Sequence, residues 1–205
     1  RGDNRRLTGE DLMKGQPALR RGERLSPAAL GMVASLGLPG VPAMRRLRVA
    51  YFSTGDEILS LGEPPREGAV YDSNRYTVFG LLTRLGCEVI DLGLVQDDPA
   101  TLAATLRRAA HEADAIVTSG GVSAGAADHT REVMQQLGDM AFWRIAMRPG
   151  RPLAVGLIPR NASQQAGPAV LFGLPGNPVA VMVTFLAFVR PALLRMMGCH
   201  DAASA

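Results

Sequence analysis

The sequence predicts an α/β fold, a three-layer sandwich in which helices cover both faces of a mostly parallel sheet. From Leu47 onward, short apolar runs alternate with amphipathic helical stretches, and polar loops that contain glycine follow three of the runs. This alternation is typical of parallel sheets with right-handed crossovers. The 205 residues have room for one such domain and an extra segment, because a domain usually holds about 100–150 residues.

The elements before residue 47 are sparse. Residues 1–46 are rich in glycine, proline and arginine and contain one helical candidate, SPAALGMVASLG, which Ser26 would cap and Pro27 would begin. We interpret residues 1–46 as the end of a preceding domain and a linker, residues 47–198 as the α/β domain, and residues 199–205 as a tail.

The elements of the main domain follow in order. LRVAYFS is a predicted strand, and a long excursion over residues 58–74 follows it, with Pro64 and Pro65 excluding a regular helix interior. RYTVFGLLTRLG has one apolar helical face, CEVIDLG is a strand, and Asp98 would cap the next helix. Further strands are predicted in DAIVTS, AFWRIAM, PLAVGLI and PAVLFGL, the last two forming an antiparallel pair, with a helix around VMQQL.

The final helix, from Val179, is apolar on all sides, which predicts that it is buried, with a kink at Pro191. Its most apolar part, residues 179–189, is half the length of the about 20 residues that a membrane span needs. The start, RGDNRRLTGE, has no apolar core and is no signal peptide. We therefore expect a soluble, cytoplasmic protein with no membrane partner.

Composition excludes some functions. The 22 basic and 19 acidic residues give a net charge of +3, and aromatic residues make up 5%, which argues against nucleic acid as a partner. The arginine clusters near the N-terminus are typical of solvated charges in linkers. The two cysteines, Cys87 and Cys199, cannot build a metal cage, and we expect them to be reduced.

Three polar loops follow predicted strands and would share one edge of the sheet: STGDE (53–57), SGGVSAGAAD (119–128) and GLPGNP (173–178). Glycines allow the backbone to approach a ligand, and backbone N–H groups at such loops bind anions. Together the three loops predict a ligand that carries phosphate.

Charged side chains should lie at the same edge. Asp72, Asp98 and Asp128 precede predicted helices and are typical caps, whereas Glu57 and Asp97 have no capping role and are better candidates for chemistry. Carboxylates beside bound phosphates are the usual ligands of Mg²⁺. The basic candidates are Arg144, Arg148 and Arg151, whose guanidinium groups suit tetrahedral oxyanions, although surface arginines flanking a turn explain them equally well.

Two other kinds of site are disfavoured. Ser119 and Ser123 could suggest a nucleophile, but none of the three histidines is suitably placed for a Ser-His-Asp triad. SGGVSAG also lacks the G-x-G-x-x-G spacing of a dinucleotide-binding loop.

The motifs STGDE, YDSN, LGCEV with LGLVQDDP, TSGGVSAGAADHT, AFWRIAMRPGRP and GLPGNPV occur in the order found in one family. Over residues 47 to about 198 the chain resembles the molybdopterin molybdenumtransferases, the MoeA proteins and the E domain of gephyrin. The resemblance implies the fold of a molybdopterin-binding domain. It also implies an enzyme that takes adenylylated molybdopterin and molybdate, with Mg²⁺, and releases AMP and the molybdenum cofactor.

The resemblance also assigns roles to residues. The family's acidic catalytic and metal-binding residues fall on Glu57, Asp97 and Asp128. The expected substrate-binding residues are Ser53, Thr54, Gly55, Ser119, Gly120, Gly121, Ser123, Gly125, Arg144, Arg148, Arg151, Pro175, Gly176, Asn177 and Pro178. The three arginines stand where family members often have lysines, which leaves the oxyanion contacts open. The family acts as a homodimer with further domains, so we expect this chain alone to bind weakly.

Two alternatives to the transferase stay open. A molybdopterin adenylyltransferase shares the glycine loop, but such proteins lack the segment before residue 47 and the combination of FWRIAMRPGRP with GLPGNP. A non-enzymatic scaffold like the gephyrin E domain would bind partners through an apolar groove in a further domain.

Overall fold

The computed structural model of the chain describes residues 5–121, 129–160 and 167–200. The chain forms two compact units, one of residues 1–45 with 194–205 and one of residues 46–193. The first unit contains helix α1 (Pro27–Ser35), whose N-cap is Ser26 with its hydroxyl accepting the Ala29 N–H at 3.2 Å, as predicted. This helix buries Ala29 and Val33, so it contributes few side chains to a core.

The second unit is built on a six-stranded sheet with the order β4-β1-β5-β8-β7-β6. Strands β4, β1, β5 and β8 are parallel, whereas β7 is antiparallel to both β8 and β6. The mostly parallel sheet and the antiparallel β7–β8 pair confirm the sequence predictions. The strand bounds are β1 (Arg48–Thr54), β4 (Glu88–Val95), β5 (Ala115–Ser119), β6 (Asp139–Arg144), β7 (Pro152–Ile158) and β8 (Ala169–Leu174).

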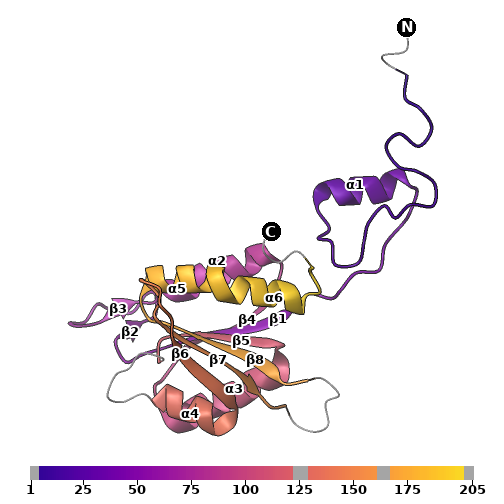
Figure 1. The fold of residues 1–205 in the computed structure, drawn as a ribbon. Helices are drawn as coiled ribbons and strands as arrows, with labels where there is room; N and C mark the ends of the chain where they lie inside the picture. Colours follow the sequence, from indigo (N-terminus) through magenta and orange to yellow (C-terminus); the bar gives the residue numbers. More distant parts are fainter. Residues whose placement is uncertain (1–4, 122–128, 161–166, 201–205) are drawn as a thin grey trace. The chain divides into compact units, whose positions relative to one another are not determined.

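Helices cover both faces of this sheet (Figure 1). On one face lie α2 (Ser73–Leu85) and α5 (Pro178–Thr184), and on the other lie α3 (Pro99–Glu112) and α4 (His129–Leu137). Phe52, Leu106 and Met134 belong to the apolar core between the sheet and α3 with α4. Because side chains alternate along a strand, Tyr51 and Ser53 face the opposite layer.

Two predicted helix caps are confirmed. The Asp72 carboxylate accepts the Arg75 N–H at 3.0 Å, and the Asp98 carboxylate accepts the Thr101 N–H at 2.8 Å. Each aspartate satisfies a backbone donor that has no partner within its helix.

The last helix differs from the prediction. It continues from α5 through a π-helical turn, η1 (Phe185–Val189), into α6 (Arg190–Met196). Pro191 has no N–H, and its ring would clash with a carbonyl of the preceding turn of a regular helix, so the wider turn before it accommodates the ring. The expected complete burial is wrong, since Val179, Met182 and Leu186 are 60%, 44% and 46% exposed.

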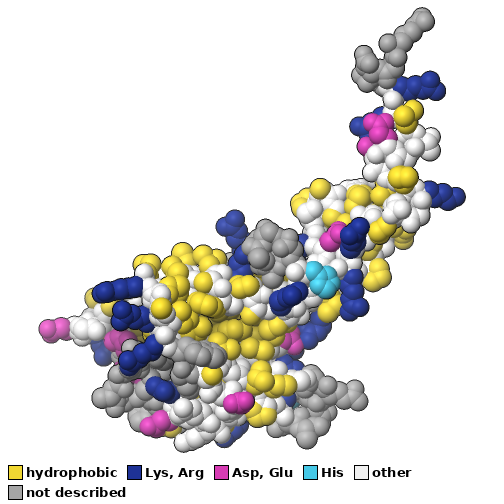
Figure 2. Space-filling view, in the orientation of Figure 1, with side chains coloured by type: hydrophobic (Ala, Val, Ile, Leu, Met, Phe, Trp, Pro, Cys, Tyr) yellow, Lys and Arg dark blue, Asp and Glu magenta, His cyan; other side chains and the backbone are white. Residues whose placement is uncertain are grey.

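The reason is that the helix lies on one face of the sheet, so only one of its sides can pack there. Figure 2 shows hydrophobic side chains gathered over this layer. In the described part of the chain, Pro178–Met196 has the length and the mean hydropathy, 1.8, that would allow a helix to cross a membrane, and 39% of an 18-residue stretch of it is buried. Core helices of soluble proteins meet the same criterion, so this is weak evidence for a span.

The excursion between β1 and α2 contains two short strands that the sequence did not reveal, β2 (Ile58–Leu59) and β3 (Val70–Tyr71). They pair in parallel, and the Val70 N–H donates to the Glu57 carbonyl at 2.8 Å. We call residues 55–72 the arm. With two residues in each strand, neither could show a period in the sequence.

Both cysteines, Cys87 and Cys199, are free thiols and buried. Burial raises the pKa of the Cys87 thiol to about 11, so this thiol stays protonated near neutral pH. Strand β4 begins at Glu88, one residue after Cys87.

Candidate functional site

The predicted site residues meet at one edge of the sheet because of the strand directions. The carboxyl ends of β4, β1, β5 and β8 lie at this edge, and the loops with QDDP, STGDE, SGG and GLPGNP follow them. Strand β6 runs parallel to β8, so the turn after it, residues 145–151, reaches the same edge. Ligands of open α/β sheets bind at this kind of edge.

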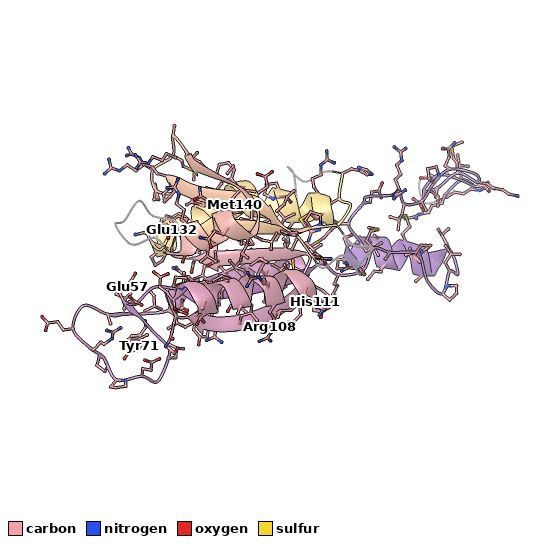
Figure 3. All side chains as sticks on the ribbon, turned by 90° about the horizontal axis from the view of Figure 1, so that it is seen from below. Glu57, Tyr71, Arg108, His111, Glu132 and Met140 are labelled. Carbon is pink, nitrogen blue, oxygen red and sulfur yellow. The ribbon has the colours of Figure 1, made fainter. Side chains whose placement is uncertain are left out.

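Glu57 is exposed at the base of the arm, close to the end of β1. Gly55 adopts a φ of +148°, and a Cβ at that position would lie 2.9 Å from an oxygen of the Glu57 carboxylate. The φ of +148° is a backbone conformation that residues with a side chain rarely adopt, which favours glycine at this position. Figure 3 shows Glu57 at one end of the domain and His111 near the other end of α3.

Asp97 lies after β4 and is partly buried. Its carboxylate accepts a hydrogen bond from the Thr130 hydroxyl at 3.2 Å, and Thr130 is fully buried in the first turn of α4. Thr130 was not among the residues predicted from the sequence. Its position two residues after Asp128 was the available signal, but a threonine at a helix start is ordinary.

The glycine loop after β5 begins with two residues at positive φ, Gly120 at +88° and Gly121 at +65°. The Gly120 N–H donates to the Leu174 carbonyl at 3.1 Å, and a Cβ on Gly120 would overlap the Thr54 carbonyl oxygen. This N–H therefore joins the ends of β5 and β8 and is not free to bind an anion. Three predicted site residues of this loop, Ser123, Gly125 and Asp128, lie outside the described residues.

The hydroxyl groups of Ser53 and Ser119 form a buried cluster with Tyr51. The Tyr51 hydroxyl lies 2.9 Å from that of Ser53 and 2.7 Å from that of Ser119, and all three residues are 1–2% exposed. Desolvation by burial raises the pKa of the Tyr51 phenol above its ordinary value, so the phenol is neutral. The Thr54 hydroxyl is also buried, on the α3 and α4 side of the sheet, and has no hydrogen-bond partner among the described residues.

The turn after β6 and the loop after β8 line an open pocket of about 430 Å³. Arg148 and Arg151 line it together with Pro175, Gly176 and Asn177. The structure thus brings two of the three predicted arginines against the predicted GLPGNP loop. Arg144, on strand β6, and Pro178, at the start of α5, are not among the lining residues.

A further residue missed from the sequence supports this pocket. The Asn74 side-chain amide donates to the Gly176 carbonyl at 2.7 Å, although 102 positions separate the two residues. Asn74 is 6% exposed, and its side-chain oxygen has no hydrogen-bond partner in the part of the chain that the structure describes. The bond fixes the GLPGNP loop against the first turn of α2.

Two kinds of charged side chain, acidic and basic, lie at this edge of the sheet. Glu57 and Asp97 supply oxygen ligands, which suit Mg²⁺, and Arg148 and Arg151 supply charged donors, which suit an oxyanion. The described residues contain no group of three His, Cys, Asp or Glu side chains that could hold a metal ion alone. Mg²⁺ often binds through one or two carboxylates, water and the phosphates of a substrate, and two carboxylates fit that mode.

Comparisons with known proteins agree on one family. A family model described as probable molybdopterin binding domain matches residues 50–195. The chain is similar to a molybdopterin molybdenumtransferase of Haemophilus influenzae, with 44% identity over 195 residues, which cover 95% of this chain and 46% of that protein. A molybdopterin molybdenumtransferase of Nostoc sp. is 38% identical over 194 residues, which cover 94% of this chain and 43% of that protein.

A solved structure is also similar. The molybdopterin biosynthesis MoeA protein of Pyrococcus horikosii is 34% identical, with a TM-score of 0.76, and the match covers 93% of this chain and 45% of that one. The chain spans about half the length of the curated relatives it matches, 46% and 43%.

Proposed function

The chain belongs to the family of probable molybdopterin binding domains, and from this membership we propose that it is the molybdopterin-binding part of a molybdopterin molybdenumtransferase. The family resemblance drawn from the motifs is thereby confirmed. The proposed reaction inserts molybdate into adenylylated molybdopterin and releases AMP. The observation that carries the proposal is the pocket of Arg148 and Arg151 beside the GLPGNP loop, at the edge that also holds Glu57 and Asp97.

The arginines would bind the anionic groups of the substrates. Molybdate and phosphate are both tetrahedral oxyanions, and a guanidinium group donates two parallel N–H groups to such an anion. Cleavage of the phosphoanhydride creates negative charge, which fixed positive groups stabilise without rearranging. Arg148 and Arg151 would therefore hold the oxyanion and stabilise the charge that develops.

Glu57, Asp97 and Asp128 would hold Mg²⁺. When bound, the ion polarises a phosphoryl oxygen and neutralises charge on the substrate. The chain's own contribution is to hold these residues at the edge: the Val70 N–H bonds to the Glu57 carbonyl, and the Thr130 hydroxyl bonds to the Asp97 carboxylate. The loop with Gly120 and Gly121 would lie against the pterin phosphate.

The remaining parts of the proposal concern the whole protein. We infer adenylylated molybdopterin and molybdate as its substrates, a homodimer as its assembly and the cytoplasm as its location. The adenylyltransferase alternative is no better supported, because both curated relatives above are named molybdenumtransferases. No observation on the described residues favours a non-enzymatic scaffold.

The test is to incubate the full-length protein that carries this chain with adenylylated molybdopterin and molybdate, and to measure AMP. Release of AMP that depends on molybdate supports the transferase. No release would defeat it, and synthesis of adenylylated molybdopterin from ATP would favour the adenylyltransferase. Asp128→Ala should strongly reduce AMP release, and unchanged turnover would remove Asp128 from the mechanism.

A further inference from the structure

Asp97 has one hydrogen bond within the described part of the chain, the one from the Thr130 hydroxyl at 3.2 Å. Thr130 is fully buried, so water does not compete for its hydroxyl. A hydroxyl group has a single proton to donate, and here the proton goes to the carboxylate. The bond engages one oxygen of Asp97 and leaves the second oxygen for another partner.

Gly121 packs directly against the Thr130 side chain and leaves space for it because it has no side chain of its own. A Cβ added to Gly121 would overlap the Thr130 side chain. Gly121 also has a positive φ of 65°, which other residues rarely adopt. The loop after β4, the loop after β5 and the start of α4 therefore meet at this one hydroxyl.

We propose that Thr130 is a positioning residue for the ligand site: its hydroxyl fixes the Asp97 carboxylate so that the free oxygen faces the cation and phosphate of the substrate. The inference rests on the proposed function, because it requires Asp97 to act on the ligand. A carboxylate at a loop end otherwise samples several rotamers, and a charge-assisted hydrogen bond selects one of them.

The experiment compares two substitutions at one position. Thr130→Val keeps the shape and removes the hydroxyl, whereas Thr130→Ser keeps the hydroxyl. We expect kcat/KM for AMP release by the full-length protein to fall about tenfold in Thr130→Val, the equivalent of one lost hydrogen bond to a charged group, and about twofold in Thr130→Ser. Equal losses in the two variants would overturn the proposal.

A double-mutant cycle separates positioning from packing. In an Asp97→Ala background, Thr130→Val should cause no further loss of kcat/KM, since the group to be positioned is gone. A merely structural threonine would lower turnover by the same factor in both backgrounds, and that result would overturn the inference.

The same four proteins are also unfolded in urea without substrate. We expect the Thr130–Asp97 pair to be coupled by about a tenfold factor in the unfolding equilibrium constant, as for one hydrogen bond to a charged group. The absence of coupling would overturn the hydrogen bond itself. If the wild-type protein released no AMP, the proposed function would fail, while this unfolding cycle would still report on Thr130 and Asp97. If Asp97→Ala left turnover unchanged, the inference would fail alone.

Discussion

The two ends of the sheet edge differ in charge and in construction. At the β4 and β1 end, Glu57 and Asp97 are acidic, and the strands are parallel. At the β7 and β6 end, Arg148 and Arg151 are basic, and the strands are antiparallel. We call these the acidic half and the arginine half. The glycine loops after β5 and β8 lie between them, so a ligand that spans the edge would meet carboxylates at one end and guanidinium groups at the other.

The halves also differ in how their side chains are held. Asp97 bonds to a fully buried threonine, whereas Arg148 and Arg151 are exposed on a turn. The turn is one wall of the pocket, and the opposite wall is the GLPGNP loop, which Asn74 and Gly120 tie to the rest of the domain. The difference teaches that Asp97 in the acidic half is held by a hydrogen bond of its own side chain, whereas in the arginine half the hydrogen bonds belong to the GLPGNP loop that faces the arginines.

The largest effect is expected from Gly120→Ala. Gly120 lies between the two halves, where the loop after β5 contacts the ends of β1 and β8. The new Cβ would overlap the Thr54 carbonyl oxygen, and the φ of +88° is strained for alanine. We expect a loss of about 3 kcal/mol in the free energy of unfolding, measured in urea, from strain and overlap together. Gly86→Ala is the matched control, because Gly86 has a φ of +91° with nothing within 4 Å of the added Cβ.

The control should cost about 1 kcal/mol, from backbone strain alone. If both substitutions cost the same, the close approach at Gly120 contributes nothing, and the two halves are joined in some other way.

The next effect concerns the arginine half alone. Replacing Arg148 and Arg151 together by alanine should weaken molybdate binding by about a hundredfold, because two charge-assisted donors are lost. Calorimetry with molybdate measures it. Replacement of both by lysine should cost about tenfold, since the charge stays and the paired N–H geometry goes. Arg107→Ala, on the exposed side of α3, is the control and should leave affinity unchanged. Equal affinity in the wild type and the double alanine variant would remove the oxyanion from this pocket.

The parallel sheet and the position of the loops at one edge could be predicted from the sequence, because both follow from local patterns. Alternating apolar runs and helical faces predict a parallel sheet, and parallel strands bring their following loops to one edge. The helix caps Asp72 and Asp98 could also be predicted, because a cap is a local interaction with a residue three positions away.

The supporting residues could not be predicted. Asn74 bonds to Gly176 across 102 positions and Tyr51 to Ser119 across 68, and no periodicity in the chain encodes such pairs. The predicted burial of the last helix was wrong. Its composition shows that all its sides are apolar, but the fold decides which side packs against the sheet. Gly120 is a similar case. The sequence predicts that its backbone N–H binds an anion, but this N–H donates to the Leu174 carbonyl of a distant strand.

A smaller effect should follow from Asn74→Leu, which removes the hydrogen bond that holds the GLPGNP loop of the pocket to α2. The substitution keeps the approximate volume and leaves the Gly176 carbonyl without its donor. We expect a loss of about 1 kcal/mol in the free energy of unfolding and about a threefold loss in molybdate affinity. Ser73→Ala, next to Asn74 and exposed, is the control. A loss of stability without any change in affinity would mean that the position of the loop does not matter to the arginine half.

The smallest effect is expected from Arg144→Ala, and it sets the boundary of the arginine half. Arg144 opposes Pro152 in the β6–β7 pair but does not line the pocket, whereas Arg148 and Arg151 do. Its guanidinium group is exposed and would act on a bound anion through water, where salt screens the interaction. We therefore expect molybdate affinity to fall by less than about twofold at 0.15 M salt, against about tenfold for Arg148→Ala. If calorimetry gave equal losses for the two variants, the anion would contact strand β6, and the arginine half would extend from the turn to the edge of the sheet.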